Sequence, residues 1–474
     1  MIAMTSQIPL KDVTARNQQP ITFVPPAQTG EPIHTRSFKG FFRNLRLSGA
    51  GALILLFFGT AWLNWNGHQA VLWDLDAKQF FIFGATFWPQ DFILLSAILM
   101  IAAFGLFFIT VFAGRVWCGY TCPQSVWTWI FMWAEKVTEG ERHQRVRLDA
   151  APWSFNKLAR RSAKHGIWLA VSLATAIAFV GYFTPVRELV SDMLQLQLGA
   201  SSAFWLFFFT AATYFNAGWL REKVCLHMCP YSRFQSVMFD EHTLVVTYDS
   251  ARGEARGPRK KNIDHSAAGL GDCIDCTVCV QVCPTGIDIR DGLQLDCISC
   301  GACIDACNSV MDQMDYPRGL IRYTSERALE GKPTHWLRPR LVGYAAVLLL
   351  MVGSLVWGIQ TRPLIDLDIS RDRSIFRENS AGDIDNLYTL KVINKSQQSR
   401  SYLVDLGEPE LFKAQGLGEV TIAGGETAVL PVRVSRQHPD KHAGSQPLQF
   451  VVKDLQDTDS QVSDASTFVS PAAR

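Results

Sequence analysis

Charged residues are scarce in this chain of 474 residues. Asp, Glu, Lys and Arg together make up 19% of it, whereas hydrophobic residues make up 48%, including 30 Phe and 14 Trp. This balance favours membrane spans joined to soluble parts over a single soluble domain. The net charge of +2 says little about partners because the charge is unevenly distributed.

Charge is absent altogether from five stretches that are each about long enough to cross a bilayer core, which takes roughly 20 apolar residues. Buried helices of a large soluble protein are the alternative, but a soluble core rarely needs five such runs. The predicted spans are Leu47–Trp65, Phe92–Ala113, Gly166–Pro185, Ser201–Leu220 and Leu341–Ile359. The first 40 residues are polar and show no signal-peptide pattern, so we expect the first apolar run to be a span.

Lys and Arg are depleted from alternate connecting segments. Residues 1–46 carry six and residues 114–165 carry nine, whereas 66–91 and 186–200 carry one each. Positive charge stays on the cytoplasmic side of a membrane. We therefore expect the first two of these segments and the large segment 221–340 to be cytoplasmic, and the tail after the fifth span to be periplasmic.

Cysteine is missing from residues 364–474, the part predicted to lie outside the cytoplasm, where disulfides are favoured. All twelve cysteines fall instead on the predicted cytoplasmic side. Because that compartment is reducing, so many cysteines indicate metal binding rather than disulfides.

Eight of the cysteines form two runs, "CIDCTVCVQVCPTG" and "CISCGACIDACNS", with the spacing C-x2-C-x2-C-x3-C. Three cysteines at this spacing wrap one corner of a four-iron cluster, and the fourth ligates the other cluster. Zinc sites with four cysteines usually use two separated pairs, which this spacing does not match. The first predicted [4Fe–4S] cluster has the ligands Cys273, Cys276, Cys279 and Cys307, and the second has Cys297, Cys300, Cys303 and Cys283.

The other four cysteines form a repeated pair, each at the end of an apolar run. "RVWCGYTCPQSVW" and "KVCLHMCPYSRFQSV" both contain Cys-x3-Cys-Pro, so Cys118 corresponds to Cys225 and Cys122 to Cys229. Proline is favoured at the first position of a helix. We therefore expect the second cysteine of each pair at a helix N-cap, where the helix dipole favours a thiolate.

Both pairs are predicted at the same membrane face, so four thiolates can converge there. A disulfide fits a reducing compartment poorly. A structural zinc site, a further iron–sulfur cluster and a copper site stay open, since soft thiolates select Cu(I). The chemistry of the residues alone leaves zinc and copper nearly level.

The remaining segments complete the expected organisation. The basic stretch 249–272 is typical of a flexible linker near lipid headgroups, and we expect no nucleic-acid partner. Strand-like alternation in 387–394, 428–435 and 447–455 predicts an immunoglobulin-like β-sandwich in the tail. His438 and His442 in that tail are expected to be solvated loop residues rather than metal ligands.

The predicted fold class is a multi-pass α-helical membrane protein with an inserted two-cluster ferredoxin-like module and a C-terminal Ig-like β-sandwich. The predicted parts are a cytoplasmic N-terminal tail (1–46), a four-span membrane core with both Cys-x3-Cys-Pro motifs (47–240), a basic linker (241–272), the ferredoxin module (273–325), a connector with the fifth span (326–362) and a periplasmic Ig-like domain (363–474).

The chain resembles the FixG/RdxA/CcoG family of cytochrome c oxidase accessory proteins. The resemblance rests on "VLWDLDAKQFFIFGATFWPQDF" (71–92), both Cys-x3-Cys-Pro motifs, "CVQVCPTGIDIRDGLQ" and "VMDQMDYPRGLIRY" (310–323). Membrane polyferredoxins of the NapH and NosR type share the membrane core. The second cysteine run has Asn308 where proline usually follows, which removes no ligand.

The resemblance implies a bacterial inner-membrane protein that takes part in assembly of the cbb3-type cytochrome oxidase together with copper assembly factors. It further implies reduction of Cu(II) to Cu(I), with electrons from an unidentified donor. By motif, the residues that bind and reduce copper would be Cys118, Cys122, Cys225 and Cys229. Two alternatives stay open: a quinol dehydrogenase-like polyferredoxin that passes electrons to another protein, and a non-catalytic assembly scaffold.

Overall fold

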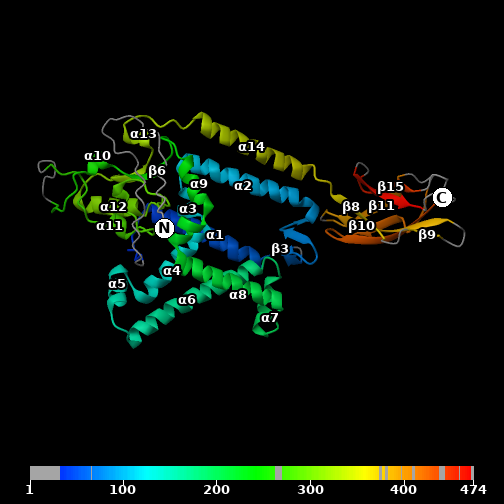
Figure 1. Ribbon diagram of the computed structural model, residues 1–474, viewed down its shortest axis with the longest axis horizontal. Coiled ribbons are helices and arrows are strands. Elements are labelled where there is room, and N and C mark those ends of the chain that lie inside the picture. Colours follow the sequence, from blue (N-terminus) through cyan, green and yellow to red (C-terminus); the bar gives the residue numbers. More distant parts are fainter. Residues whose placement is uncertain are drawn as a thin grey trace, which may run out of the picture. The chain divides into compact units, whose positions relative to one another are not determined.

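The computed structural model of the chain is shown in Figure 1. It describes residues 33–65, 67–261, 269–372, 376–378, 383–396, 398–407, 412–436, 444–457 and 460–470. Most of the predicted N-terminal tail, part of the predicted linker, and both His438 and His442 lie outside the described residues. The chain forms two compact units, the first built from Met1–Leu56, Ala103–Ala176 and Leu206–Val347, the second from Phe57–Ala102, Ile177–Trp205 and Leu348–Arg474.

Several helices of the chain are long and apolar. Among the described residues, four helices are long and apolar enough to span a membrane: α1 (Phe41–Trp62), α2 (Phe92–Ala113), α6 (Phe155–Val180) and α14 (Pro339–Gln360). The most apolar windows of α2 and α14 are not buried at all against the protein. A helix that exposes apolar side chains all round is suited to lipid rather than to water, so four of the five predicted spans are confirmed as long helices.

The remaining predicted span, 201–220, is helical but interrupted. It begins as α8 (Ala200–Tyr214) and continues as a π-helical turn, η2 (Phe215–Leu220). The fifteen residues of α8 are too few to cross a bilayer core alone. Together the two segments extend over the whole predicted span.

Short helices follow the long ones in the first unit. They are α3 (Val116–Tyr120), α4 (Pro123–Glu139) and α5 (Arg142–Ala150) after α2, and η3 (Val224–Met228) and α9 (Pro230–Met238) after η2. The two groups begin at corresponding points of the sequence repeat, and each contains one Cys-x3-Cys-Pro motif.

The ferredoxin module also belongs to the first unit. Strand β6 (Val245–Tyr248) pairs antiparallel with β7 (Ile321–Thr324), and the two cysteine runs lie between them. The enclosed elements are α10 (Ser250–Gly253), α11 (Val278–Gln281), η4 (Ile289–Asp291) and α12 (Ala302–Met314), and α13 (Glu326–Leu329) follows β7 (Figure 1). Part of the predicted linker 241–272 is therefore built into the module, because β6 supplies one of its strands and Val246 is fully buried in its core.

The second unit also contains two small sheets and two short helices that precede the sandwich in the sequence. The sheets are formed by β1 (Asn64–Trp65) with β2 (His68–Gln69), and by β3 (Val71–Asp74), β4 (Gln79–Ile82) and β5 (Ala85–Phe87). Short helices η1 (Pro89–Asp91) and α7 (Val186–Leu194) lie in the loops. The η1 carboxylate Asp91 binds Arg362 at 2.6 Å and Lys395 at 3.4 Å, and all three side chains are largely buried.

The tail forms a β-sandwich, as predicted. One sheet has the order β12 (Lys413–Gln415), β14 (Thr427–Arg436), β10 (Ile384–Asn394) and β8 (Ile365–Arg371), with β9 (Arg377–Glu378) also paired to β10. The other has the order β13 (Gly418–Ile422), β11 (Arg400–Leu406), β15 (Ser445–Asp454) and β16 (Gln461–Val469). The three strands predicted from alternation correspond to β10, β14 and β15.

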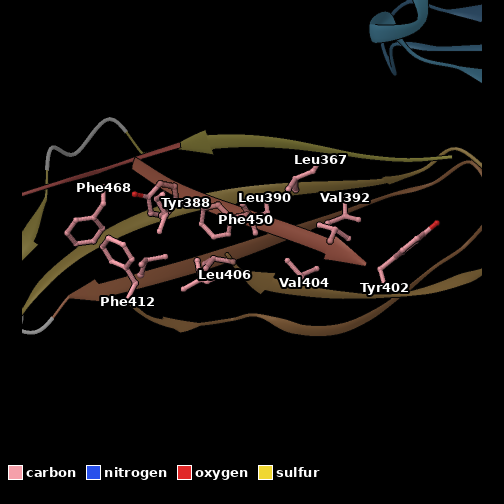
Figure 2. Packing of buried hydrophobic residues seen from close by; sticks show 14 of the residues in the cluster. Leu367, Tyr388, Leu390, Val392, Tyr402, Val404, Leu406, Phe412, Phe450 and Phe468 are labelled. Carbon is pink, nitrogen blue, oxygen red and sulfur yellow. The ribbon is translucent and has the colours of Figure 1, made fainter. Parts of the chain in front are cut away.

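Alternation along these strands places apolar side chains between the two sheets. Leu390, Val392 and Phe450 are fully buried, and Tyr388 meets Phe450 with ring centroids 5.4 Å apart (Figure 2). Their neighbours in the strands point the other way, as the period of two requires. This core contains no cysteine, so apolar packing and strand pairing stabilise the sandwich without a disulfide.

Candidate iron–sulfur and thiol site

The eight cysteines of the ferredoxin module line two cavities. Apolar side chains such as Ile298 and Leu320 complete the walls. One cavity is lined by Cys273, Cys276, Cys279 and Cys307. The other is lined by Cys283, Cys297, Cys300 and Cys303, and Cys279 also reaches it. Each cavity therefore combines three thiols of one run with the last thiol of the other run. The ligand assignment stays a prediction, and this grouping supports it.

The backbone coils in the same way around both cavities. The second and fourth residues after the first cysteine of each run have positive φ: Asp275 (53°) and Thr277 (53°), Ser299 (51°) and Gly301 (71°). Non-glycine residues rarely adopt this left-handed conformation. A left-handed residue beside a right-handed one aims successive N–H groups into a concave site, an arrangement that many iron–sulfur centres use. The local strain thus indicates loops shaped around an anionic group.

The thiols around the cavities are desolvated. Burial raises the pKa of Cys279, Cys297 and Cys307 to about 12, so without a metal they would hold their protons at neutral pH. In the part of the chain that the structure describes, no three His, Cys, Asp or Glu side chains meet closely enough to hold one metal ion. Thiols that surround a cavity without meeting at a point suit a four-iron cluster better than a single zinc ion.

The repeated pairs occupy equivalent places in the fold. Cys122 is the N-cap of α4 and Cys229 is the N-cap of α9, and a proline is the first residue of each helix. The N-cap prediction is thereby confirmed. Cys118 lies in α3, whereas Cys225 lies in the π-helical turn η3. Such turns are rare and occur frequently at functional sites.

The two pairs converge across the repeat. The Cys118 sulfur lies 3.5 Å from both Oε1 and Nε2 of Gln235, a fully buried residue on α9 of the second copy. Burial raises the pKa of Cys118 to about 11 and that of Cys225 to about 12. Negative charge on Cys122 and Cys229 would raise both pKa values further, so the four cysteines belong to one region, although among the described residues no three of them meet closely enough to hold one ion.

Hydrogen bonds fix the main chain of the second pair. The Ser232 hydroxyl donates to the carbonyl oxygens of Cys225 at 2.6 Å and Cys229 at 3.0 Å. The Gln124 amide of the first copy donates to the carbonyl oxygens of Asn216 at 2.9 Å and Arg221 at 3.2 Å, which belong to the approach to the second copy. Side chains next to each Cys-Pro step therefore hold the pairs in register.

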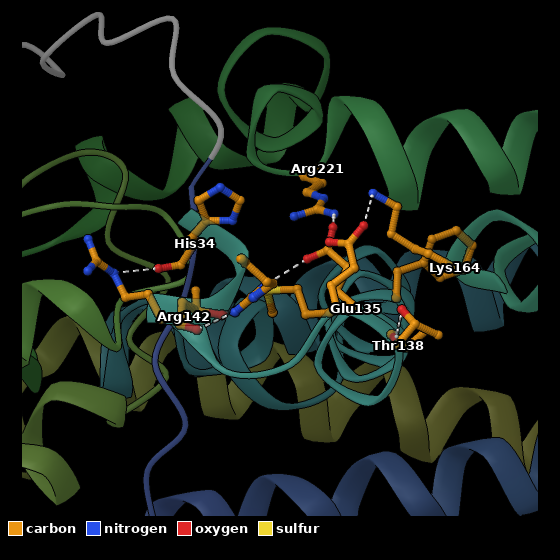
Figure 3. A network of polar contacts seen from close by, with 12 residues as sticks. His34, Glu135, Thr138, Arg142, Lys164 and Arg221 are labelled. Atoms are coloured by element: carbon orange, nitrogen blue, oxygen red, sulfur yellow. Dashed lines mark hydrogen bonds and ion pairs between the residues drawn. The ribbon is translucent and has the colours of Figure 1, made fainter. Parts of the chain in front are cut away.

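A buried ion network supports this arrangement from the far end of α4. Glu135 binds Arg145 at 2.9 Å and also pairs with Arg221, four residues before Cys225. One turn later Glu139 binds Lys164 of α6 at 3.0 Å. Figure 3 shows Arg221 and Lys164 pointing toward the carboxylates of α4. Because removing one partner of a buried pair leaves an uncompensated charge, the network strongly favours one placement of α4 against η2.

The sequence does not predict several residues of this site. Gln235 and Ser232 contact the thiol pairs or their main chain, and Arg115 donates to the Ser232 carbonyl oxygen, but only the basic residue before each pair has a signal in the repeat. Gln235 and Ser232 act from the helix that follows the second pair. Nothing in the local sequence shows that this helix, α9, packs against Cys118 of the first pair.

Fold and cysteine sites together define a class of protein: a membrane protein with a dicluster ferredoxin module and an appended β-sandwich. Two family models match this chain. A 4Fe–4S dicluster domain matches residues 220–326, and an Ig-like fold found at the C-terminus of FixG matches residues 355–471. The predicted fold class is thereby confirmed.

Relatives extend the similarity over most of the chain. It is 37% identical over 407 residues to the nitrogen fixation protein FixG of Rhizobium meliloti, covering 78% of each chain. It is 38% identical over 444 residues to protein RdxA of Cereibacter sphaeroides, covering 90% of this chain and 92% of that one. The chain therefore belongs to the FixG/RdxA family, as its motifs predict.

A solved structure resembles part of the chain. A FixG-related protein from Vibrio parahaemolyticus is 26% identical, covering 22% of this chain and 95% of that one, with a TM-score of 0.21.

Proposed function

We propose that this protein is a membrane-bound cupric reductase that delivers Cu(I) during assembly of a cbb3-type cytochrome oxidase. The observation that carries the proposal is the convergence of four thiols beside a dicluster ferredoxin module. Soft thiolates favour Cu(I) over Cu(II). A site built from them therefore draws the ion toward its reduced state.

Two [4Fe–4S] clusters, when bound, supply electrons one at a time, which suits a one-electron reduction of copper. Cys273, Cys276, Cys279 and Cys307 would hold one cluster and Cys283, Cys297, Cys300 and Cys303 the other. Cys118, Cys122, Cys225 and Cys229 would bind the copper substrate as thiolates, with their protons released to water. The thiols must move together to share one ion, and the short α3 and η3 segments are the parts that would adjust.

The proposal includes a sidedness and a partner. The Lys and Arg asymmetry supports a cytoplasmic ferredoxin module and cytoplasmic thiol pairs, with the β-sandwich in the periplasm. The sandwich would contact the oxidase or its copper assembly factors. The electron donor would reach the ferredoxin module from the cytoplasm.

The test uses anaerobically purified protein reduced with dithionite and then mixed with a Cu(II) complex. We expect rapid oxidation of the clusters together with formation of Cu(I). Cys118→Ser combined with Cys225→Ser should abolish both copper binding and copper-driven cluster oxidation, while iron and sulfide content stay unchanged. Thr121→Ser, a conservative change inside the first pair, is the matched control and should behave as wild type.

Three outcomes would contradict the proposal. Undiminished copper reduction by the double variant would make the pairs structural. Rapid reduction of the clusters by a quinol, with no response to copper, would favour a quinol dehydrogenase. Full oxidase assembly by a protein that lacks both clusters would favour a scaffold.

A further inference from the structure

The Cys-x3-Cys-Pro loop of the first copy packs directly against the ferredoxin module. A Cβ atom on Gly119 would lie 2.7 Å from the carbonyl oxygen of Ile298, 2.9 Å from Cα of Cys300 and 3.0 Å from the carbonyl oxygen of Ser299. Real Cβ contacts are never so short, so only glycine permits this approach. The residue next to Cys118 thus touches the backbone of a predicted cluster ligand.

A buried arginine spans the same interface. Arg115 donates from its guanidinium to the carbonyl oxygen of Leu295 in the module and to that of Ser232 beside the second thiol pair. The titratable groups whose negative charge would act on it are Cys118, Cys297, Asp296 and Cys225. Arg115 is therefore the cation shared by the thiol site and by one of the cysteine cavities.

Two further contacts hold the interface closed. The Tyr120 hydroxyl lies 3.3 Å from that of Tyr323, which in turn donates to the carbonyl oxygen of Ser299. On the other side of the same loop, a Cβ atom on Gly301 would lie 2.7 Å from the Phe42 ring at the start of α1. The segment 297–301 is therefore fixed against the membrane part of the chain from two directions.

The other cavity has a different cation. Arg290 lines the cavity of Cys273, Cys276 and Cys307, and its charge acts on Cys279. It is held by Asp275 and Asp288 within the module itself. The two cavities thus differ in a way that experiment can exploit, because each has its own buried or half-buried arginine.

We propose that the cavity of Cys283, Cys297, Cys300 and Cys303 holds the cluster from which the membrane-edge thiols receive their electron, across the contact of Gly119 with Cys300, and that Arg115 is the positioning residue between them. The proposal rests on the proposed function and adds an order to it: the cavity near Arg115 holds the last cluster before copper. One electron passes from the reduced cluster to Cu(II), giving Cu(I) and the oxidised cluster, and no bond to the chain is formed or broken. A low-potential one-electron carrier, dithionite in the assay, restores the reduced state.

The first experiment assigns the two clusters by potential. A nearby positive charge favours the more negative, reduced cluster, so its removal makes the potential more negative. In redox titrations followed by EPR, Arg115→Gln should shift one midpoint potential downward and Arg290→Gln the other. Arg115→Lys keeps the charge, so its midpoint potential should stay close to the wild-type value.

The next measurement tests which cluster lies nearer to the thiol pairs, and it does not depend on copper reduction. Co(II), a paramagnetic ion that thiolates bind without reducing it, is added to the reduced protein. We expect faster electron-spin relaxation of the signal that Arg115→Gln shifts, and little change in the signal that Arg290→Gln shifts. Cys118→Ser combined with Cys225→Ser, which removes metal binding, should abolish the effect. Faster relaxation of the other signal, or of both equally, would overturn the proposed order.

The second experiment tests the contact itself. Gly119→Ala forces the loop away from Ile298 and Cys300, so cluster oxidation by Cu(II) should slow several-fold while copper affinity and iron content hold. Gly49→Ala is the matched control, because its Cβ would meet only the Tyr120 carbonyl oxygen at 3.9 Å. An unchanged rate in Gly119→Ala would refute the route.

Failure of the two proposals can be told apart. If copper is not the substrate, no variant will show copper-driven oxidation, yet the Co(II) effect on one cluster persists. If the route is wrong and copper is the substrate, Cu(I) still forms at the wild-type rate in Gly119→Ala. Should Gly119→Ala lose its clusters, the potentials and relaxation of the arginine variants decide the question alone.

Discussion

The first prediction concerns Asp305, which lies between two predicted cluster ligands, Cys303 and Cys307, and caps the long helix α1. Its carboxylate accepts hydrogen bonds from the backbone N–H groups of Phe42 at 3.2 Å and Arg43 at 2.8 Å, at the start of α1. The side chain is almost fully buried. Asp305→Ala removes both acceptors and the negative charge that stabilises a helix N-terminus.

The magnitude follows from these contacts. Loss of an N-cap side chain costs about 1 kcal/mol, and loss of a carboxylate at a helix N-terminus about 0.3–1 kcal/mol more, toward the upper end when partly buried. The start of α1 should thus open with a free energy lower by about 2 kcal/mol, which corresponds to roughly a 30-fold larger open population. Asp305→Asn keeps an acceptor without the charge and should fall in between.

Hydrogen exchange measured by mass spectrometry on the detergent-solubilised protein is the assay. Peptides that cover residues 38–46 should lose protection by the stated factor in Asp305→Ala. Asp312→Ala is the matched control, since it removes a carboxylate from the exposed face of the same helix, α12, where the partner is Arg318. Unchanged protection in Asp305→Ala would refute the argument that the ferredoxin module caps α1.

Three other predictions follow from the fold and the cysteine cavities. Cys283→Ser should damage the cluster of Cys297, Cys300 and Cys303 and spare the cluster held by the other cysteines of its own run. The expected readout is loss of one EPR signal together with about four of the eight irons. A reporter fused after Arg362 should read periplasmic and one inserted in 249–272 cytoplasmic, and a periplasmic linker would reverse the sidedness. Phe450→Ala should destabilise the sandwich by about 3–5 kcal/mol, measured as faster hydrogen exchange in β10 and β15, whereas Leu455→Ala, at a half-exposed position, should have little effect.

Local patterns predicted the parts of this molecule whose structure depends on local forces. The span Phe92–Ala113 is recovered with the same bounds because an uninterrupted apolar run ends at Gly114, whose φ of 60° turns the chain. The cysteine runs, the two N-caps and the three alternating strands are likewise set by neighbouring residues. Composition and spacing contain this information directly.

Long-range contacts set the rest. The fourth predicted span changes into π-helical turns, where Asn216 and Arg221 accept hydrogen bonds from Gln124, about ninety residues earlier. The sequence of β6 predicts only a linker, because its partner strand β7 lies more than seventy residues away. Neither the cap of α1 by Asp305 nor the approach of Gly119 to Cys300 has a sequence signal, since each pairs segments that are remote in the chain.

The two copies of the repeat differ in a way that bears on function. In the first, Trp117 separates the basic-valine pair from Cys118, whereas the second has no such residue before Cys225 and forms a π-helical turn there. Both copies still place a cysteine at an N-cap. Only the first copy, however, has the glycine contact with the module and the arginine that spans the interface. A thiol site formed by both copies would then receive electrons through the first copy alone, at Gly119, which we call the entrance.

That asymmetry makes a last prediction about single variants. Cys118 stands beside Gly119 at the entrance, so Cys118→Ser should slow copper-driven cluster oxidation more than it weakens copper binding. Cys225 lies in the copy without that contact, and Cys225→Ser should weaken copper binding while the electron transfer rate at saturating copper stays near wild type. Stopped-flow oxidation rates measured over a range of copper concentrations separate the two effects. Identical behaviour of both variants would mean that electrons reach the thiols from both copies equally, and the single entrance would be wrong.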